Sequence, residues 1–235
     1  MTPIHRPHAV LLPAVLGLVA LVAACSGPGA GPTAVPTAEA SAAPSAEASA
    51  APSAEAGACP TSQPDALPAG ETRTVTIDTN LGSMELAIEA DLSPIAAGNF
   101  VALAECGWYD GVVFHRVVPG FVIQGGDGEN GRAPNVDPST VGTGGPGYTI
   151  EDEPVTAEYG RGVVAMARTS QPNSVGSQFF IVLDDGAEPA LSEFNTYQII
   201  GSVASGMEVA DAIAGAADKQ IPTDPVVMTD VSVAP

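Results

Sequence analysis

Apolar and polar residues alternate along two neighbouring runs in the first half of the chain. Residues 72–79 alternate with a period of two, and residues 83–89 do so again after a turn at residues 80–82. This period is typical of a half-buried β-strand, so the two runs predict a β-hairpin. Further strand-like runs cover residues 112–118, 121–124, 162–168, 178–183, 197–203 and 226–234.

Two other segments have a helical pattern. Ser93 is a favoured N-cap residue, and Pro94 suits the first helical position. The segment continues with Phe100 on its apolar face and stops near Gly107, and a shorter helix is expected over residues 206–214. Many strands with two helices far apart in sequence indicate a mostly β domain, built as a closed barrel with helices over its ends.

The N-terminal residues have the pattern of a targeting segment. Arg6 supplies positive charge, and the apolar run at residues 9–24 is shorter than the roughly 20 residues that span a membrane. Residues 21–25 read LVAAC, which resembles a bacterial lipoprotein box. The resemblance implies a signal peptide at residues 1–24 and lipidation of Cys25, where two or more acyl chains anchor firmly. The alternative is an ordinary secretory signal with an incidental cysteine.

A segment of low complexity follows. Residues 26–70 are rich in Ala, Pro, Ser, Gly and Glu, and residues 41–48 repeat identically at 49–56. So few large apolar side chains cannot offset the entropy of ordering the chain. We therefore expect a disordered tether at residues 25–70, which separates a folded domain at residues 71–235 from the membrane.

The charge and composition exclude several classes of partner. The chain has 27 Asp and Glu against 7 Lys and Arg, so nucleic acids and anionic membrane surfaces would be repelled. A solvated acidic face on a soluble extracellular domain accounts for this balance. His115 is the only histidine beyond the first ten residues, and only two cysteines remain besides Cys25, so we expect no metal and no cofactor. The glycines of residues 128–148 open no helix and favour no phosphate site. We expect a monomer.

Two runs carry the candidate chemistry. Residues 114–127 read FHRVVPGFVIQGGD, and residues 176–180 read GSQFF. Alternation along the strand and a bend at the Pro-Gly pair could bring Arg116, Phe121 and Gln124 to one surface. A cation, an amide and aromatic rings together suit a peptide carbonyl beside an apolar ring.

These two runs resemble the cyclophilin family of peptidyl-prolyl isomerases, whose blocks are FHR-x-x-PGF-x-x-QGGD and GSQFF. Residues 166–168 correspond to the family's short M-A-N strand end, and the resemblance extends from about Glu71 to Pro235. It implies eight antiparallel strands closed into a barrel, two capping helices, and a site on the outer face of the barrel. The implied activity is cis-trans isomerisation of the peptide bond before proline.

The resemblance also implies the roles of the site residues. Arg116 is the expected catalytic residue, because a guanidinium can stabilise the twisted amide. Gln124 is expected to orient Arg116, and Gln178 to hydrogen-bond the residue before proline. The remaining expected contacts are an apolar proline pocket from Phe121, Val122 and Phe180, backbone pairing from Ala167 and Arg168, and aromatic surface from Phe194 and Tyr197.

The chain departs from the family pattern at a few of these positions. Val122 stands where many members have methionine, and Tyr197 stands where many eukaryotic members have histidine. Arg168 replaces the common asparagine and is expected to add a cation to the substrate groove. His115 should point away from Arg116, and we expect a buried, hydrogen-bonded structural histidine rather than a catalytic one.

The sequence therefore predicts a lipid-anchored, extracytoplasmic peptidyl-prolyl isomerase that acts on proline-containing segments of exported proteins. One alternative is a non-catalytic module that binds proline peptides or acts as a chaperone. Another is a lipoprotein that captures a small solute. Since an exported chain meets an oxidising environment, we expect Cys59 and Cys106 to form a disulfide, with two unpaired thiols as the alternative.

Overall fold

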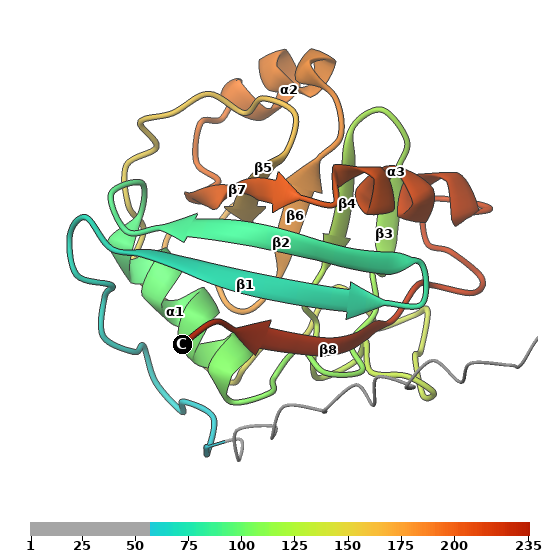
Figure 1. Ribbon diagram of the computed structural model, residues 1–235, viewed down its shortest axis with the longest axis horizontal. Helices are drawn as coiled ribbons and strands as arrows, with labels where there is room; N and C mark the ends of the chain where they lie inside the picture. Colours follow the sequence, from blue (N-terminus) through green and yellow to red (C-terminus); the bar gives the residue numbers. More distant parts are fainter. Residues whose placement is uncertain (1–56) are drawn as a thin grey trace, which may run out of the picture. The chain divides into compact units, whose positions relative to one another are not determined.

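A computed structural model describes residues 57–235, so the predicted signal peptide, Cys25 and most of the predicted tether lie outside the described residues (Figure 1). The strands are β1 (Thr72–Thr79), β2 (Gly82–Glu89), β3 (Arg116–Val118), β4 (Val122–Gly125), β5 (Val163–Met166), β6 (Phe179–Val182), β7 (Ile199–Ser205) and β8 (Met228–Val233). The helices are α1 (Pro94–Glu105), α2 (Glu188–Ser192), α3 (Met207–Ala216) and the short 3-10 helix η1 (Asp185–Ala187).

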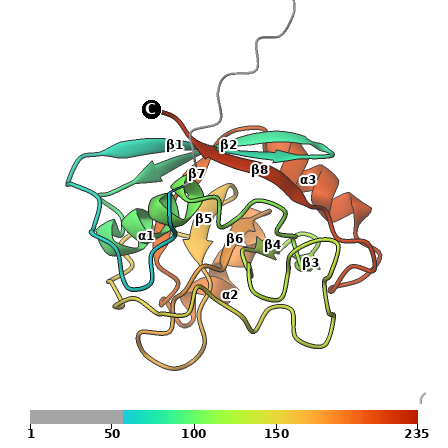
Figure 2. The ribbon, with the colours of Figure 1, turned by 90° about the horizontal axis from the view of Figure 1, so that it is seen from below.

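All eight strands form one antiparallel sheet in the order β3-β4-β6-β5-β7-β2-β1-β8. The sheet curls, with β1, β2 and β8 in one layer and β3 to β6 facing them (Figure 2). The mostly β prediction is confirmed, and the hairpin pairs in the register Thr72 with Glu89 through Thr79 with Gly82.

The predicted closed barrel is wrong. Within residues 57–235, no ladder joins the edge strands β3 and β8. Irregular backbone lies between them: the Phe114 N–H donates to the Val226 carbonyl at 2.9 Å, and the Met228 N–H to the Val112 carbonyl at 2.8 Å. Residues 112–115, which the sequence placed in a strand, form no ladder: Val112 and Val113 make isolated bridges to two different segments, and residues 114 and 115 make none.

The sequence predicted two α-helices, and the described residues contain three. Helices α1 and α3 lie where the sequence indicated them, and α2 was missed. Its five residues are too few to show a helical period, and Pro189 weakens any sequence signal further.

The start of α1 differs from the prediction in its cap. Pro94 is the first helical residue, as expected, but the buried Ser93 hydroxyl makes no cap hydrogen bond. The Glu153 carboxylate takes this role, because it accepts the N–H groups of Ile95 and Ala96, both at 2.9 Å. A carboxylate there also interacts favourably with the helix dipole.

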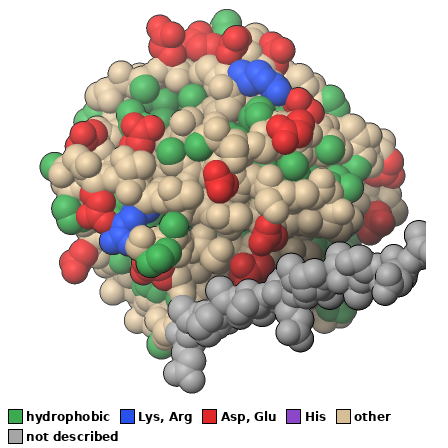
Figure 3. All heavy atoms as spheres, in the orientation of Figure 1, with side chains coloured by type: hydrophobic (Ala, Val, Ile, Leu, Met, Phe, Trp, Pro, Cys, Tyr) green, Lys and Arg blue, Asp and Glu red, His purple; other side chains and the backbone are tan. Residues whose placement is uncertain are grey.

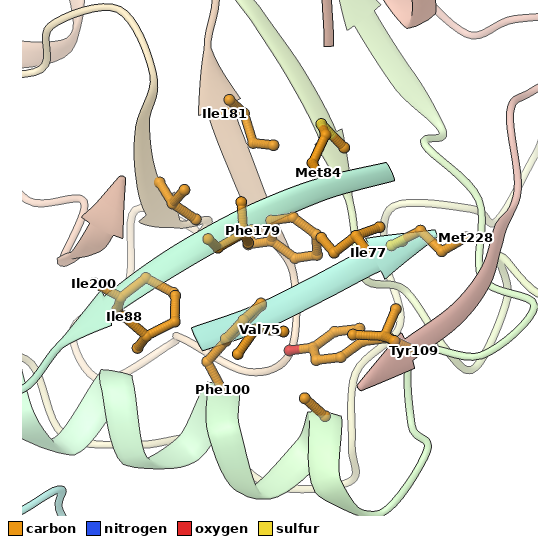
Figure 4. Close-up of a cluster of buried hydrophobic side chains, with 14 of the residues drawn as sticks. Val75, Ile77, Met84, Ile88, Phe100, Tyr109, Phe179, Ile181, Ile200 and Met228 are labelled. Atoms are coloured by element: carbon orange, nitrogen blue, oxygen red, sulfur yellow. The ribbon is translucent and has the colours of Figure 1, made fainter. Parts of the chain in front are cut away.

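The main core fills the space between the curled sheet and α1 (Figure 4). Phe100 of α1 contacts Tyr109 and Phe179, with ring centroids 5.1 and 5.2 Å away. Phe180, the next residue of β6, points to the opposite face of the sheet, as alternation along a strand requires. There it joins a second cluster with Val122, Tyr159, Leu191 and others. The second cluster supports the candidate site.

Residues 57–70, assigned by the sequence to the tether, pack against α1. Cys59 and Cys106 form a disulfide with a Cα–Cα distance of 5.1 Å. The Leu67 N–H donates to the Pro94 carbonyl at 3.0 Å, and a Cβ at Gly98 would collide with the Asp65 backbone. The folded domain therefore begins before residue 71, where the sequence predicted its start.

Carboxylates outnumber basic side chains on the molecular face shown in Figure 3. In the described part of the chain, no helix has both the length and the apolar character that a membrane span needs.

Candidate active site

The β3–β4 hairpin sets the two central polar side chains of the site side by side. Arg116 is paired with Gln124 across the hairpin, so both side chains project from the same face. The turn between the strands contains Gly120 at φ +71°, a conformation that favours glycine. The bend that the sequence predicted at this Pro-Gly pair is therefore present.

Nearly all the predicted site residues line one pocket of about 210 Å³. Its floor comes from β4 and β6, where Gln124 pairs with Phe180 and Val122 with Val182. The predicted residues that line it are Arg116, Phe121, Val122, Gln124, Ala167, Arg168, Phe180, Phe194 and Tyr197. Sequence reasoning missed Ala190 and Leu191, which also line the pocket, because they belong to the unpredicted α2.

Gln178 lies beside this pocket, in a neighbouring cavity of about 720 Å³ that also includes Gln124 and Ala167. The Gln124 Nε2 donates to the Gln178 Oε1 at 3.0 Å, and the Gln178 Nε2 donates to the Gly144 carbonyl at 2.9 Å. These two bonds fix the orientation of both amides, and no hydrogen bond joins the Gln124 side chain to Arg116 in the described residues.

A buried carboxylate holds the glycine-rich loop that supplies this carbonyl. Asp127 accepts the N–H groups of Asn130 at 2.8 Å, Gly142 at 2.7 Å and Gly144 at 3.0 Å. Asp127 closes the QGGD run directly before the loop, and no role was expected for it from the sequence. Its position explains how a glycine-rich loop presents one defined carbonyl to Gln178.

A buried tyrosine stabilises the aromatic wall of the pocket. Tyr197 meets Phe180 edge to face, with ring centroids 5.4 Å apart. The buried Tyr159 hydroxyl donates to the Tyr197 carbonyl at 3.0 Å and accepts the Tyr197 N–H at 3.1 Å. Phe194 lies at the rim and is 65% exposed. A rigid inner wall with an exposed aromatic rim suits a small apolar ring of a larger ligand.

The guanidinium of Arg116 is half-buried, and within residues 57–235 it has no ion pair and no hydrogen bond to protein. Burial lowers the pKa of Arg116 from its ordinary value, and Tyr197 opposes this shift. Because arginine titrates so far above neutrality, the group stays charged. The pocket therefore contains one cation whose hydrogen-bond donors are available to a ligand.

At the neighbouring strand end, the expectation about Arg168 needs correction, and one backbone group of Ala167 is already engaged. The Arg168 guanidinium adds no free cation to the groove: its side chain is only 9% exposed, pairs with Asp152 at 2.9 Å and donates to the Gln171 carbonyl at 2.7 Å. The Ala167 N–H donates to the Gln178 carbonyl at 2.8 Å. This N–H is therefore unavailable for pairing with a substrate.

His115 is buried, as expected, but neither ring nitrogen makes a hydrogen bond of good geometry within residues 57–235, although the Gln178 side chain and the Val113 backbone lie close enough to favour the protonated ring. Burial lowers its pKa from 6.5 to about 4; nearby Asp127 opposes the shift and Arg116 adds to it. The imidazole is therefore neutral at physiological pH. No cluster of three or more metal-ligating side chains occurs in the same described range.

This pKa predicts how stability depends on pH. Because the native pKa of about 4 lies below the ordinary value of 6.5, the unfolded chain binds more protons between these values. The contribution of His115 is complete above pH 6.5 and is lost as the pH falls through 4, a total of roughly 3 kcal/mol. Urea unfolding of the wild type and His115→Leu across this range checks it. Parallel pH profiles for the two proteins would contradict the prediction.

Comparison with known proteins gives consistent matches. A family model described as cyclophilin type peptidyl-prolyl cis-trans isomerase/CLD matches residues 74–233. A probable peptidyl-prolyl cis-trans isomerase of Brucella abortus (strain 2308) is 41% identical over 147 residues, 62% of this chain and 73% of that protein. Peptidyl-prolyl cis-trans isomerase A of Dickeya dadantii is 34% identical over 171 residues, 68% of this chain and 83% of that protein. Among solved structures, the chain is similar to a Cryptosporidium parvum cyclophilin type peptidyl-prolyl cis-trans isomerase, crystallised in the presence of the dipeptide Ala-Pro. The two superpose with a TM-score of 0.58 at 32% identity, covering 69% of this chain and 99% of that one.

Proposed function

The chain belongs to the cyclophilin-type peptidyl-prolyl cis-trans isomerases, and from this premise we propose that it isomerises X-Pro bonds in exported proteins, with Arg116 as the catalytic residue. Rotation about this bond crosses a barrier of ~18–20 kcal/mol, because it breaks amide resonance. The enzyme needs no nucleophile and no general base. It must bind the twisted amide more tightly than either planar form.

The available donors of Arg116 support this role. In the twisted amide the nitrogen regains its lone pair, and a guanidinium can donate to that nitrogen or hold the proline carbonyl. Gln124 lies directly opposite Arg116 across the hairpin and is itself fixed by Gln178. The guanidinium therefore keeps its donors for the substrate, because no protein carboxylate pairs with it in the described residues.

The apolar part of the pocket supports the assignment of the substrate. Phe121, Val122 and Phe180 line the same small pocket as Arg116 and would hold the pyrrolidine ring. Gln178, which accepts a hydrogen bond from Gln124, would meet the residue before proline. The solved relative that was crystallised in the presence of Ala-Pro supports a proline-containing peptide as the ligand.

This proposal rests on one observation: an unpaired, half-buried guanidinium lines the same small pocket as several aromatic side chains. Two-dimensional exchange NMR on a proline tetrapeptide, with residues 57–235 as catalyst, tests it directly. We expect cis-trans exchange to accelerate in proportion to protein concentration. Shifted peptide resonances without accelerated exchange would instead favour the non-catalytic peptide-binding module.

We also propose that the enzyme is a monomer, extracytoplasmic and lipid-anchored through Cys25. The LVAAC run at residues 21–25 supports lipidation, and the disulfide supports an oxidising compartment. Labelling of cells with an alkyne fatty acid should mark the full chain and leave Cys25→Ser unmarked. Equal labelling of both proteins would contradict the anchor, and sedimentation of the folded domain checks the monomer.

A further inference from the structure

A second cavity, of about 480 Å³, adjoins the proline pocket on the side of β3. The two cavities share Arg116 and Phe121 as lining residues, so they are neighbours on the surface. The outer wall is the segment at residues 217–220, which follows α3. This segment is held beside β3, because the Val117 N–H donates to the Gln220 carbonyl at 2.8 Å.

Two cations without protein partners line this cavity. Lys219 is the only lysine of the chain, and neither it nor Arg116 has an ion pair or a side-chain hydrogen bond in the described range. The other described arginines are all engaged: Arg73 with Glu71, Arg132 with the carbonyls of Trp108 and Asp110, Arg161 with Asp211, and Arg168 with Asp152.

One carboxylate also lines the cavity, and it is already engaged. Asp218 accepts the Thr223 N–H at 2.9 Å and the Thr223 hydroxyl at 2.7 Å. It forms no ion pair with Lys219, the next residue, although the hydrogen bonds from Thr223 and, to a smaller extent, the nearby Lys219 charge lower the pKa of Asp218. The ammonium of Lys219 is therefore exposed and available in a chain whose net charge is −20.

We propose that this second cavity is a subsite for a carboxylate side chain of the substrate, carried by one of the residues after proline and met by Lys219. The inference rests on the proposed function, and the order of the strands gives its direction. Gln178, assigned to the residue before proline, lies beside β6, and β4 separates β6 from β3. A peptide that crosses from Gln178 over the proline pocket leaves past Arg116 toward Lys219.

The expected selectivity is modest and specific. An exposed ion pair favours binding by roughly two- to five-fold, and salt screens it. The acidic surface of the chain repels acidic peptides at long range, whereas the cavity attracts a carboxylate locally. A client segment with Asp or Glu shortly after proline is therefore the preferred substrate class.

The test uses end-capped hexapeptides of the type Ala-Ala-Pro with one glutamate at the first, second or third position after proline, each compared with its glutamine twin. Exchange NMR gives the ratio of catalytic efficiencies, and resonance shifts on titration give the ratio of affinities. For at least one position we expect a glutamate-to-glutamine ratio of about two to five at low salt. High salt should bring this ratio toward one.

Two variants that change the net charge equally separate the subsite from the overall charge. Lys219→Gln should bring the ratio to about one, and Lys219→Glu should invert it. Arg73→Gln, on β1 and outside the cavity, should keep the wild-type ratio. No preference for glutamate in the wild type, or equal losses in Lys219→Gln and Arg73→Gln, would overturn the subsite. Absence of accelerated exchange for all peptides would instead overturn the proposed function. The glutamate-to-glutamine affinity ratios would still show whether the second cavity binds a carboxylate.

Discussion

Replacing Arg116 by alanine should lower kcat/KM for X-Pro isomerisation by about 30- to 1,000-fold. One charge-assisted hydrogen bond made to the twisted amide is worth roughly 2–4 kcal/mol in the transition state. Because the same bond contributes little to the planar ground state, kcat should fall much more than peptide affinity. The fold should survive, since Arg116 lies outside both apolar clusters. Exchange NMR on a proline tetrapeptide measures the effect, and circular dichroism checks the fold.

Two further variants show whether the loss comes from the guanidinium itself. Arg116→Lys keeps the charge but lacks the planar fork, so it should recover only a minor part of the activity. Phe180→Ala removes one wall of the proline pocket and should weaken peptide binding together with turnover. Near-wild-type activity in a folded Arg116→Ala protein would show that the site assignment is wrong.

Removing the Cys59–Cys106 disulfide should lower the free energy of unfolding by up to ~4 kcal/mol. The bond closes a loop with a sequence separation of 47 residues, and loss of this constraint raises the entropy of the unfolded chain. Urea unfolding of the Cys59→Ser, Cys106→Ser double variant, against the oxidised wild type, measures the difference.

The reduced wild type is the matched control for this prediction, because it keeps both cysteines. It should unfold at the same urea concentration as the double variant. Residues 57–70 should also become more sensitive to protease in both proteins, since the disulfide and a few backbone contacts hold them on α1. Equal stability of the oxidised and reduced proteins would contradict the prediction.

Much of the fold and the gathering of the site residues could be predicted from the sequence, because their determinants are local. The hairpin follows from alternation and a turn within eighteen residues, 72–89. Arg116 and Gln124 face each other because a Pro-Gly turn lies between them. Such features need only the chemistry of neighbouring residues.

The features that the sequence did not reveal depend on distant partners. Glu153 caps α1 from a separate loop, and Asp127 organises backbone groups up to seventeen residues away. Arg168 looked like a free cation, because its partner Asp152 becomes a neighbour only in the folded chain. Closure of the barrel was likewise overestimated, since the edge strands are bridged by irregular backbone instead of a ladder.

Strand β6 couples the candidate pocket to the global stability of the domain. Phe179 belongs to the main core and Phe180 to the pocket, and both backbones are paired within the interior of the sheet. The pocket floor therefore cannot open as a separate cooperative unit. Amide hydrogens of β6 should exchange only when the whole domain unfolds, and catalysis should persist on heating until the domain melts.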